Sequence, residues 1–222
     1  MSGRPLIGIV DYGMGNRRSV EKALEHVGAE VVLTADRERL AAAAGLVVPG
    51  VGAFPVAMRK LRDLGLDRLI GDAAAEGKPL LGICLGMQLL FERSLELEPT
   101  AGLGLVAGDV TPLQTGGLRI PHIGWNEVTV VRSSPLTAGL EAAGRPFYHV
   151  HSLAARPRSD DDVVATTTYG ERFATIVQRG LVFGVQFHPE KSSADGLKLL
   201  ESFVGVCAAA SARPSPSAAL RA

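Results

Sequence analysis

Residues 82–92 read Gly-Ile-Cys-Leu-Gly-Met-Gln-Leu-Leu-Phe-Glu, which places Cys84 between two glycines. The apolar run from Pro79 to Ile83 predicts a strand, and the pattern after Cys84 predicts an amphipathic helix. Glycines on both sides allow the backbone to turn sharply at the cysteine without a Cβ clash. The sequence therefore predicts a nucleophile elbow. Its thiol lies at a helix N-terminus, where unpaired N–H groups and the helix dipole favour the thiolate.

The composition predicts one α/β domain. The chain has 222 residues, of which 46% are hydrophobic and 5% aromatic, enough for one aliphatic core. Lys plus Arg equals Asp plus Glu at 23 each, so the charge does not favour nucleic acid or an anionic membrane as a partner. No apolar stretch reaches the length of a membrane span or forms a signal peptide, which favours a cytoplasmic protein. Cys84 and Cys207 fit a reducing compartment and make no disulfide framework.

Short β-branched runs alternate with helical patterns in the first part of the chain. Strands are expected at 6–10, 31–33, 46–48 and 79–83, with a helix at 19–27. This alternation predicts a mostly parallel sheet with helices on both faces and a ligand site at the carboxyl ends of the strands.

The second part of the chain is richer in strand patterns. Runs at 128–131, 147–150, 163–168, 174–177 and 181–187 predict an antiparallel extension of the sheet. A final helix is expected at 192–209. The domain is therefore expected to span 1–209, and the composition of 210–222 is typical of a disordered tail.

A second informative segment, residues 185–192, reads Val-Gln-Phe-His-Pro-Glu-Lys-Ser at the end of the last expected strand. A cysteine that forms an acyl-enzyme needs an imidazole to move protons and a carboxylate to fix the tautomer of that imidazole. Pro189 restricts the backbone between His188 and Glu190. We therefore expect His188 to act as the base for Cys84 and Glu190 to orient His188.

A third segment, Val48-Pro49-Gly50-Val51-Gly52, follows the strand expected at 46–48. Acyl transfer needs N–H donors where the oxyanion forms, and each donor typically contributes about 10²–10³-fold in rate. We expect Val51 or Gly52, together with the N–H of Leu85, to supply these donors.

Each feature taken alone has an ordinary structural explanation. Buried cysteines mostly act as small hydrophobes, a lone histidine is mostly structural, and glycines are common in tight turns. Their joint occurrence at the ends of expected parallel strands favours a single reactive site.

Together, the three segments resemble the class I, triad-type glutamine amidotransferases, in which a G-x-C-x-G elbow and a later H-P-E supply a glutaminase triad. The resemblance implies the single-domain α/β fold of that family and no cofactor or metal. It implies that Cys84 attacks the carboxamide of glutamine, His188 moves the proton and Glu190 orients His188. It also implies that Gly52, Gln88 and Glu96 hold the substrate. The alternative for Gln88 and Glu96 is an ordinary polar helix face and loop.

Further segments resemble the branch of this family that serves histidine biosynthesis, and this similarity runs from about Leu6 to Phe203. The segments are Asp11 to Asn16, Pro121 to Glu127 and Val150 to Ser152. The resemblance implies a heterodimer with a separate (β/α)8-barrel cyclase, which receives the ammonia. It favours partner contacts at Asn16, His122, Trp125 and Lys191.

The chain also departs from that branch. Arg17 stands where an apolar residue is usual, while His149 and Leu153 stand where aromatic residues are usual. The resemblance therefore does not determine the conformation at the start of the first helix or the partner contacts near residue 150.

Two motifs do not indicate the ligand sites that they resemble. Residues 13–18 begin like a dinucleotide fingerprint but place Arg18 where that motif needs a small residue for close helix packing. His149 and His151 face one side of an expected strand, but no third ligand accompanies them at a spacing diagnostic of a metal site. A structural or interface role is favoured for this pair.

Other functions remain open at this point. A glutaminase subunit of a different synthase shares the same triad. A stand-alone Cys-His hydrolase or peptidase shares the elbow but leaves Gln88 and residues 121–126 unexplained. A silent binding module is expected to have lost a triad member, whereas Cys84, His188 and Glu190 are all present.

Overall fold

A computed structural model describes residues 4–140 and 144–212. Its central sheet has nine strands in the order β2-β1-β3-β4-β13-β12-β11-β8-β9. The parallel strands are β1 (Leu6–Val10), β2 (Glu30–Thr34), β3 (Gly45–Gly50), β4 (Leu80–Cys84) and β13 (Val182–Val185). The antiparallel strands are β8 (His122–Val130), β9 (Arg145–His151), β11 (Val163–Tyr169) and β12 (Glu171–Arg179). The expected parallel sheet with an antiparallel extension is confirmed, and the two halves meet where β13 pairs with β12.

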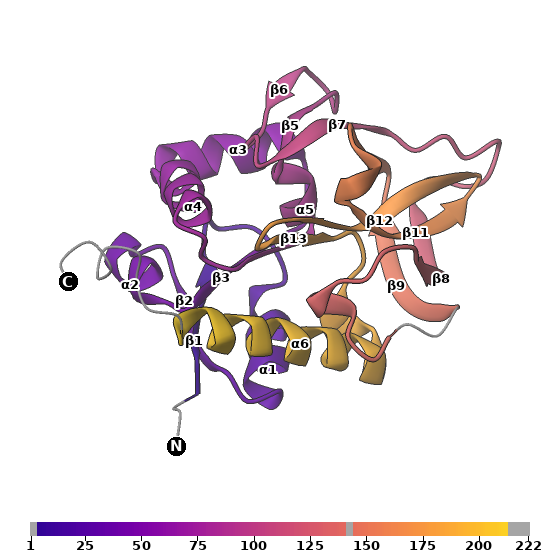
Figure 1. Cartoon of the computed structure of the whole chain (residues 1–222). Coiled ribbons are helices and arrows are strands. Elements are labelled where there is room, and N and C mark those ends of the chain that lie inside the picture. The colour runs from indigo at the N-terminus through magenta and orange to yellow at the C-terminus, as the bar shows by residue number, and fades with distance from the viewer. Residues whose placement is uncertain (1–3, 141–143, 213–222) are drawn as a thin grey trace.

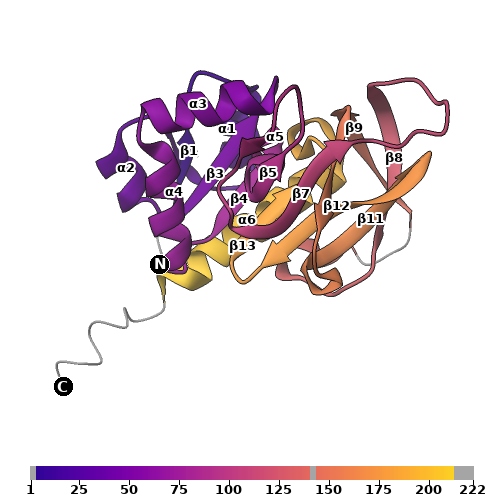
Figure 2. The same cartoon turned by 90° about the horizontal axis from the view of Figure 1, so that it is seen from above.

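Helices cover both faces of the parallel half, as Figure 1 shows. The helices are α1 (Arg17–His26), α2 (Arg37–Ala42), α3 (Phe54–Asp63), α4 (Leu66–Ala75), α5 (Leu85–Leu89) and α6 (Ser193–Ser211). Single turns of 3-10 helix are η1 (Pro135–Thr137), η2 (Asp160–Asp162) and η3 (Pro189–Lys191). Seen from above, the antiparallel strands lie on the side of the molecule opposite α2, α3 and α4 (Figure 2).

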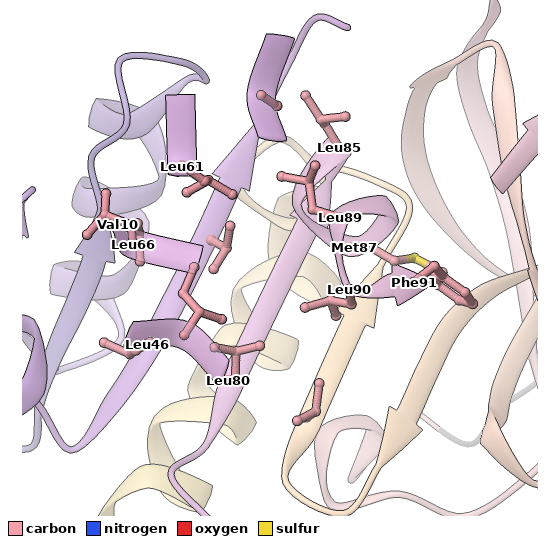
Figure 3. Close-up of a cluster of buried hydrophobic side chains, with 14 of the residues drawn as sticks. Val10, Leu46, Leu61, Leu66, Leu80, Leu85, Met87, Leu89, Leu90 and Phe91 are labelled. Carbon is pink, nitrogen blue, oxygen red and sulfur yellow. The ribbon is translucent and has the colours of Figure 1, made fainter. Parts of the chain in front are cut away.

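Successive side chains of the parallel strands point to opposite faces of the sheet and pack into two separate hydrophobic cores. In β3, Leu46 and Val48 pack toward α3 and α4, whereas Val47 packs toward α1 and α6. Figure 3 shows the first of these clusters, in which Leu46 and Leu80 lie near side chains of α3, α4 and α5. Because both faces of the inner parallel strands β1, β3, β4 and β13 are buried, these strands read as continuous apolar runs.

A second sheet was not predicted from the sequence. Its order is β10-β7-β5-β6, with bounds β5 (Phe91–Ser94), β6 (Thr100–Ala101), β7 (Val106–Pro112) and β10 (Leu153–Pro157). The helix after Cys84 is correspondingly shorter than expected, because α5 ends at Leu89 and β5 begins at Phe91. All five residues of α5 are buried, so this helix is not amphipathic.

The end of the last helix also differs from expectation. The last helix extends to Ser211, so the boundary expected at 209 cuts through its final turn. The tail expected at 210–222 lies outside the described residues from 213 onward. In residues 4–140 and 144–212, no helix is long and apolar enough to cross a membrane.

Candidate active site

The elbow at Cys84 is a strained backbone turn. Cys84 ends β4 with φ 55° and ψ −111°, a conformation with positive φ that residues other than glycine rarely adopt. A Cβ at Gly82 would lie 2.5 Å from the carbonyl oxygen of Gly86, and a Cβ at Gly86 would lie 1.7 Å from that of Val48. Both positions therefore require glycine, and the sulfur is held at the carboxyl edge of the sheet.

His188 and Glu190 lie together at the end of the neighbouring strand. His188 follows β13, which pairs with β4, and its backbone N–H donates to the Tyr148 carbonyl at 2.9 Å. The His188 Nδ1 lies 2.9 Å from Glu190 Oε1, and both side chains are almost fully buried. This contact fixes the tautomer in which Nδ1 carries a proton and leaves Nε2 for the thiol.

Two opposing effects act on the His188 pKa. Burial lowers it, but hydrogen bonds with the Cys84 sulfur and the Glu190 carboxylate raise it by more, so the net pKa lies above the ordinary value. The imidazolium form is therefore favoured beside the sulfur, as a thiolate nucleophile requires.

One cavity of about 270 Å³ collects most of the site residues expected from the sequence. Its lining includes Val51, Gly52, Cys84, Leu85, Gln88, Glu96, His188 and Lys191. Glu190 lies behind His188 and is not part of this lining. A pocket of this size, lined by both apolar and polar or charged side chains, fits a small polar molecule.

Gln88 and Glu96 are both held by neighbours. The Gln88 Nε2 donates to Gln186 Oε1 at 3.0 Å and to the Leu153 carbonyl at 3.4 Å. Glu96 Oε2 accepts the backbone N–H of Phe54, the first residue of α3, at 2.6 Å. The Glu96 carboxylate is thereby fixed at the cavity, where its charge suits a ligand ammonium group.

The expected oxyanion segment begins within β3, which runs to Gly50 rather than ending at Val48, and its last residues Val51 and Gly52 follow the strand at the same edge. Gly52 has φ 107°, and a Cβ there would lie 2.9 Å from Met14 Cε. The Tyr12 hydroxyl donates to the Pro49 carbonyl at 2.6 Å and is buried. Sequence reasoning did not single out Tyr12, although it lies within the segment from Asp11 to Asn16. Its hydrogen bond ties the oxyanion segment to the loop after β1.

The expected partner contacts divide into exposed and buried residues. Trp125 is 54% exposed and packs edge-on against Tyr148, Lys191 lies at the cavity, and the Asn16 Oδ1 accepts the Ser19 hydroxyl at the start of α1. His122 is only 3% exposed, so its ring is not a surface contact in this chain. The segment from Pro121 to Glu127 lies outside the strand expected at 128–131, but most of it belongs to strand β8, in which exposed residues alternate with less exposed ones.

Two of the departures from the related branch, Arg17 and His149, have local contacts that account for them. Arg17 forms an ion pair with Asp11 just ahead of α1. The His149 ring is fully buried, with Nδ1 at 3.0 Å from the Phe147 carbonyl and Nε2 at 2.9 Å from the Thr175 hydroxyl.

Within residues 4–140 and 144–212, no group of three or more His, Cys, Asp or Glu could hold a metal ion.

Acid is expected to destabilise the fold through these histidines. Burial lowers the pKa of His149 to about 3 and that of His151 to about 4, so the native rings stay neutral where the unfolded rings take up protons. The contribution of these two rings to the free energy of unfolding should therefore be constant above pH 6.5 and fall below it, by up to about 1.4 kcal/mol per pH unit for each ring. Urea denaturation at pH 7, 6 and 5 measures this slope.

The matched variants for this prediction are His149→Phe and His26→Asn. The first removes a buried ring that titrates on unfolding, and the second alters an exposed histidine. His149→Phe should flatten the slope below pH 6.5, whereas His26→Asn should not. An equal slope in wild type and His149→Phe would show that protonation of His149 on unfolding does not cause the loss of stability in acid.

Cys207 is predicted to be inert. It is fully buried in α6, and burial raises the pKa of its thiol to about 12. Iodoacetamide at pH 8 should therefore modify one thiol in the native protein, at Cys84, and two after unfolding. Peptide mass spectrometry identifies the modified sites, and native modification of Cys207 would refute this expectation.

Comparison with known proteins places this geometry in a family. The family model for glutamine amidotransferase class-I matches residues 8–206, and the chain belongs to this family. A relative from Geobacillus kaustophilus, imidazole glycerol phosphate synthase subunit HisH, is 48% identical, with 90% of this chain and 97% of the relative covered. The subunit HisH of Moorella thermoacetica is 50% identical, with 89% and 93% covered. Within the family, the chain belongs to the group of HisH subunits.

Solved structures support the fold alone. The structure of PurLQS from Thermotoga maritima matches with a TM-score of 0.73 at 24% identity, covering 91% of this chain and 99% of that one. A putative GMP synthase subunit from Thermoplasma acidophilum matches with a TM-score of 0.71 at 21% identity, covering 94% and 96%.

Proposed function

We propose that this chain is the glutaminase subunit of an imidazole glycerol phosphate synthase and that Cys84, His188 and Glu190 form its catalytic triad. The observation that carries the proposal is the contact of the buried His188 with Glu190 beside the strained Cys84 elbow, on one cavity. The membership of the HisH group supports the choice of synthase.

The reaction follows from the positions of these groups. The Cys84 thiolate attacks the carboxamide carbon of glutamine, and the imidazolium of His188 gives its proton to the departing nitrogen, so the C–N bond breaks and ammonia leaves. A glutamyl thioester remains. Water then attacks the thioester while His188 takes a proton from it, and glutamate and the free thiol are released.

The remaining cavity residues are assigned to the oxyanion and to the substrate. Backbone N–H groups of Val51 or Gly52 and of Leu85 stabilise the oxyanion. Glu96 binds the ammonium group of glutamine, while Gln88 and Gly52 line the space for its chain. Glu96 suits this role because α3 already fixes one of its carboxylate oxygens.

The proposed partner is a (β/α)8-barrel cyclase in a cytoplasmic heterodimer of histidine biosynthesis. In that enzyme, ammonia reacts with a ribulosyl formimino nucleotide and yields imidazole glycerol phosphate and an aminoimidazole carboxamide ribotide. A closed path between the subunits is needed because ammonia in neutral water is mostly protonated and loses its nucleophilic lone pair. The proposed contacts are the exposed Trp125, together with Lys191 and Asn16.

The test is glutamate release from glutamine by the chain alone, with the cyclase, and with the cyclase plus its nucleotide. We expect a low basal rate and strong stimulation when both are present, with Cys84→Ala as the blank. High activity that the cyclase leaves unchanged would point to a free-standing hydrolase. Stimulation only by another synthase subunit would point to a different branch of the family.

A matched pair of variants tests the proposed interface. Trp125 is 54% exposed on β8, and Leu64 is 46% exposed at the end of α3. Trp125→Ala should weaken the stimulation by the cyclase and leave the basal rate unchanged. An aromatic side chain that becomes buried when two subunits bind contributes strongly to the affinity. Leu64→Ala should change neither. If the cyclase stimulates both variants equally, Trp125 is not part of the contact surface.

A further inference from the structure

Gln186 is a buried polar residue that the proposed triad does not use. It follows β13, two residues before His188, and its side chain is 0% exposed. Its Nε2 lies 3.8 Å from the Cys84 sulfur, and its Oε1 accepts a hydrogen bond from Gln88 Nε2 at 3.0 Å. Its backbone N–H donates to the Thr175 carbonyl at 2.9 Å, which fixes the main chain. A fully buried carboxamide therefore contacts the proposed nucleophile.

The surrounding hydrogen bonds decide which end of this carboxamide faces the sulfur. The Leu153 carbonyl can only accept, so the Gln88 side chain presents its Nε2 to that oxygen at 3.4 Å. The same nitrogen faces Gln186, which must then present its oxygen to Gln88. The Gln186 nitrogen is consequently the end that points toward Cys84.

Two further contacts hold this arrangement in place. The His151 Nδ1 lies 2.7 Å from the same Leu153 carbonyl and must donate its proton to it. The His151 Nε2 is then free to accept, and it lies 3.0 Å from His122 Nδ1. A continuous buried chain of donors and acceptors therefore runs from His122 through His151, Leu153 and Gln88 to Gln186.

The Cys84 sulfur has different partners in its two protonation states. As a thiol it can donate to the Val150 carbonyl, which lies at 3.7 Å. As a thiolate it can only accept, and the Gln186 N–H is a donor within reach. A hydrogen bond to a charged acceptor in a buried site is about twice as strong as one between neutral groups. The Gln186 contact therefore favours the thiolate over the thiol.

We propose that Gln186 is a further catalytic residue, whose carboxamide N–H donates to the Cys84 sulfur and stabilises the thiolate. Gln88 and the Leu153 carbonyl act through it as positioning groups. The inference rests on the proposed function in one respect, namely that Cys84 is the nucleophile. Gln88 then serves two purposes, because it lines the cavity and also orients Gln186.

The test is the rate at which iodoacetamide alkylates Cys84 as a function of pH, in a Cys207→Ala background. Gln186→Met keeps the length of the side chain and removes the donor. We expect its alkylation rate at pH 7 to fall about tenfold and its pH–rate profile to move about one unit to higher pH. An unchanged profile would overturn the proposal.

Two further variants separate this role from a structural one. Thr175→Val, an equally buried position whose hydroxyl contacts His149, should lower stability without moving the profile. Gln186→Glu keeps the shape of the side chain and removes both N–H donors, so it decides the question if Gln186→Met does not fold. It should move the profile at least as far, and an unmoved profile would again reject the proposal.

The measurement is independent of glutamine hydrolysis. If wild type does not hydrolyse glutamine but Gln186→Met still shifts the alkylation profile, the proposed function fails and the contact with Cys84 stands. If hydrolysis is observed and the profile is unmoved, the proposed function stands and the role of Gln186 fails.

Discussion

The Cys84→Ala chain is expected to release glutamate from glutamine at least about 10⁴-fold more slowly than wild type at saturating glutamine, because no thioester can form. The residual rate should come from the proposed oxyanion donors and the bound substrate acting without a nucleophile. The loss should appear in kcat, since the cavity lining other than the sulfur is intact. A coupled glutamate dehydrogenase assay, with the cyclase and its nucleotide present, measures it.

The control for this variant is Cys207→Ala, which changes the other cysteine of the chain. Cys207 is buried in α6 and packs in the core on the α1 and α6 face. Its removal should lower stability by about 1 kcal/mol and leave kcat unchanged. Retention of more than a hundredth of the wild-type kcat in Cys84→Ala would exclude Cys84 as the nucleophile.

Gly86→Ala is expected to lower the free energy of unfolding by about 3 kcal/mol or more and to remove most glutaminase activity. The new Cβ would lie 1.7 Å from the Val48 carbonyl oxygen, and a backbone atom cannot move aside as a flexible side chain does. Relief requires α5 to separate from β3, which carries Cys84 away from Val51 and Gly52. Urea denaturation and the glutamate assay measure the two losses.

Gly71 offers the matched control. It lies within α4, and a Cβ added there meets nothing within 4 Å. Gly71→Ala should therefore raise stability by about 0.5–1 kcal/mol through helix propensity and leave the activity unchanged. If Gly86→Ala behaves like Gly71→Ala, the close approach of α5 and β3 is not a constraint on the fold.

The parallel half of the fold was predictable because its strands are buried on both faces. The runs around Ile7, Val47 and Leu81 read as strands without knowledge of their neighbours, and Gly82 and Gly86 indicated the turn at Cys84. The positions of His188 and Glu190 followed from the same reasoning, since both come after a strand that ends at the same edge.

The second sheet escaped prediction for a physical reason. Phe91 begins β5 one residue after the cap of α5, so the apolar pattern of the helix runs into the strand without a break. Residues 122–127 of β8 were not among the expected strands, because the apolar side chains of Ile123 and Trp125 are exposed while the polar His122 is buried, which is the reverse of the usual apolar-in, polar-out alternation. The sequence did not identify Gln186 or Tyr12 as site residues. Gln186 contacts Cys84 and Tyr12 contacts Pro49, and neither partner is close in sequence.

The place of β13 in the sheet affects how the protein is made. In the described residues β13 is the last strand of the chain, yet it pairs directly with β4, which carries the proposed nucleophile Cys84. During synthesis, β4 emerges long before β13 and keeps one edge unpaired, and such an edge can pair with another nascent chain. The site therefore cannot assemble during synthesis until β13 has been made, and until then the unpaired edge of β4 is open to pairing with a neighbouring chain.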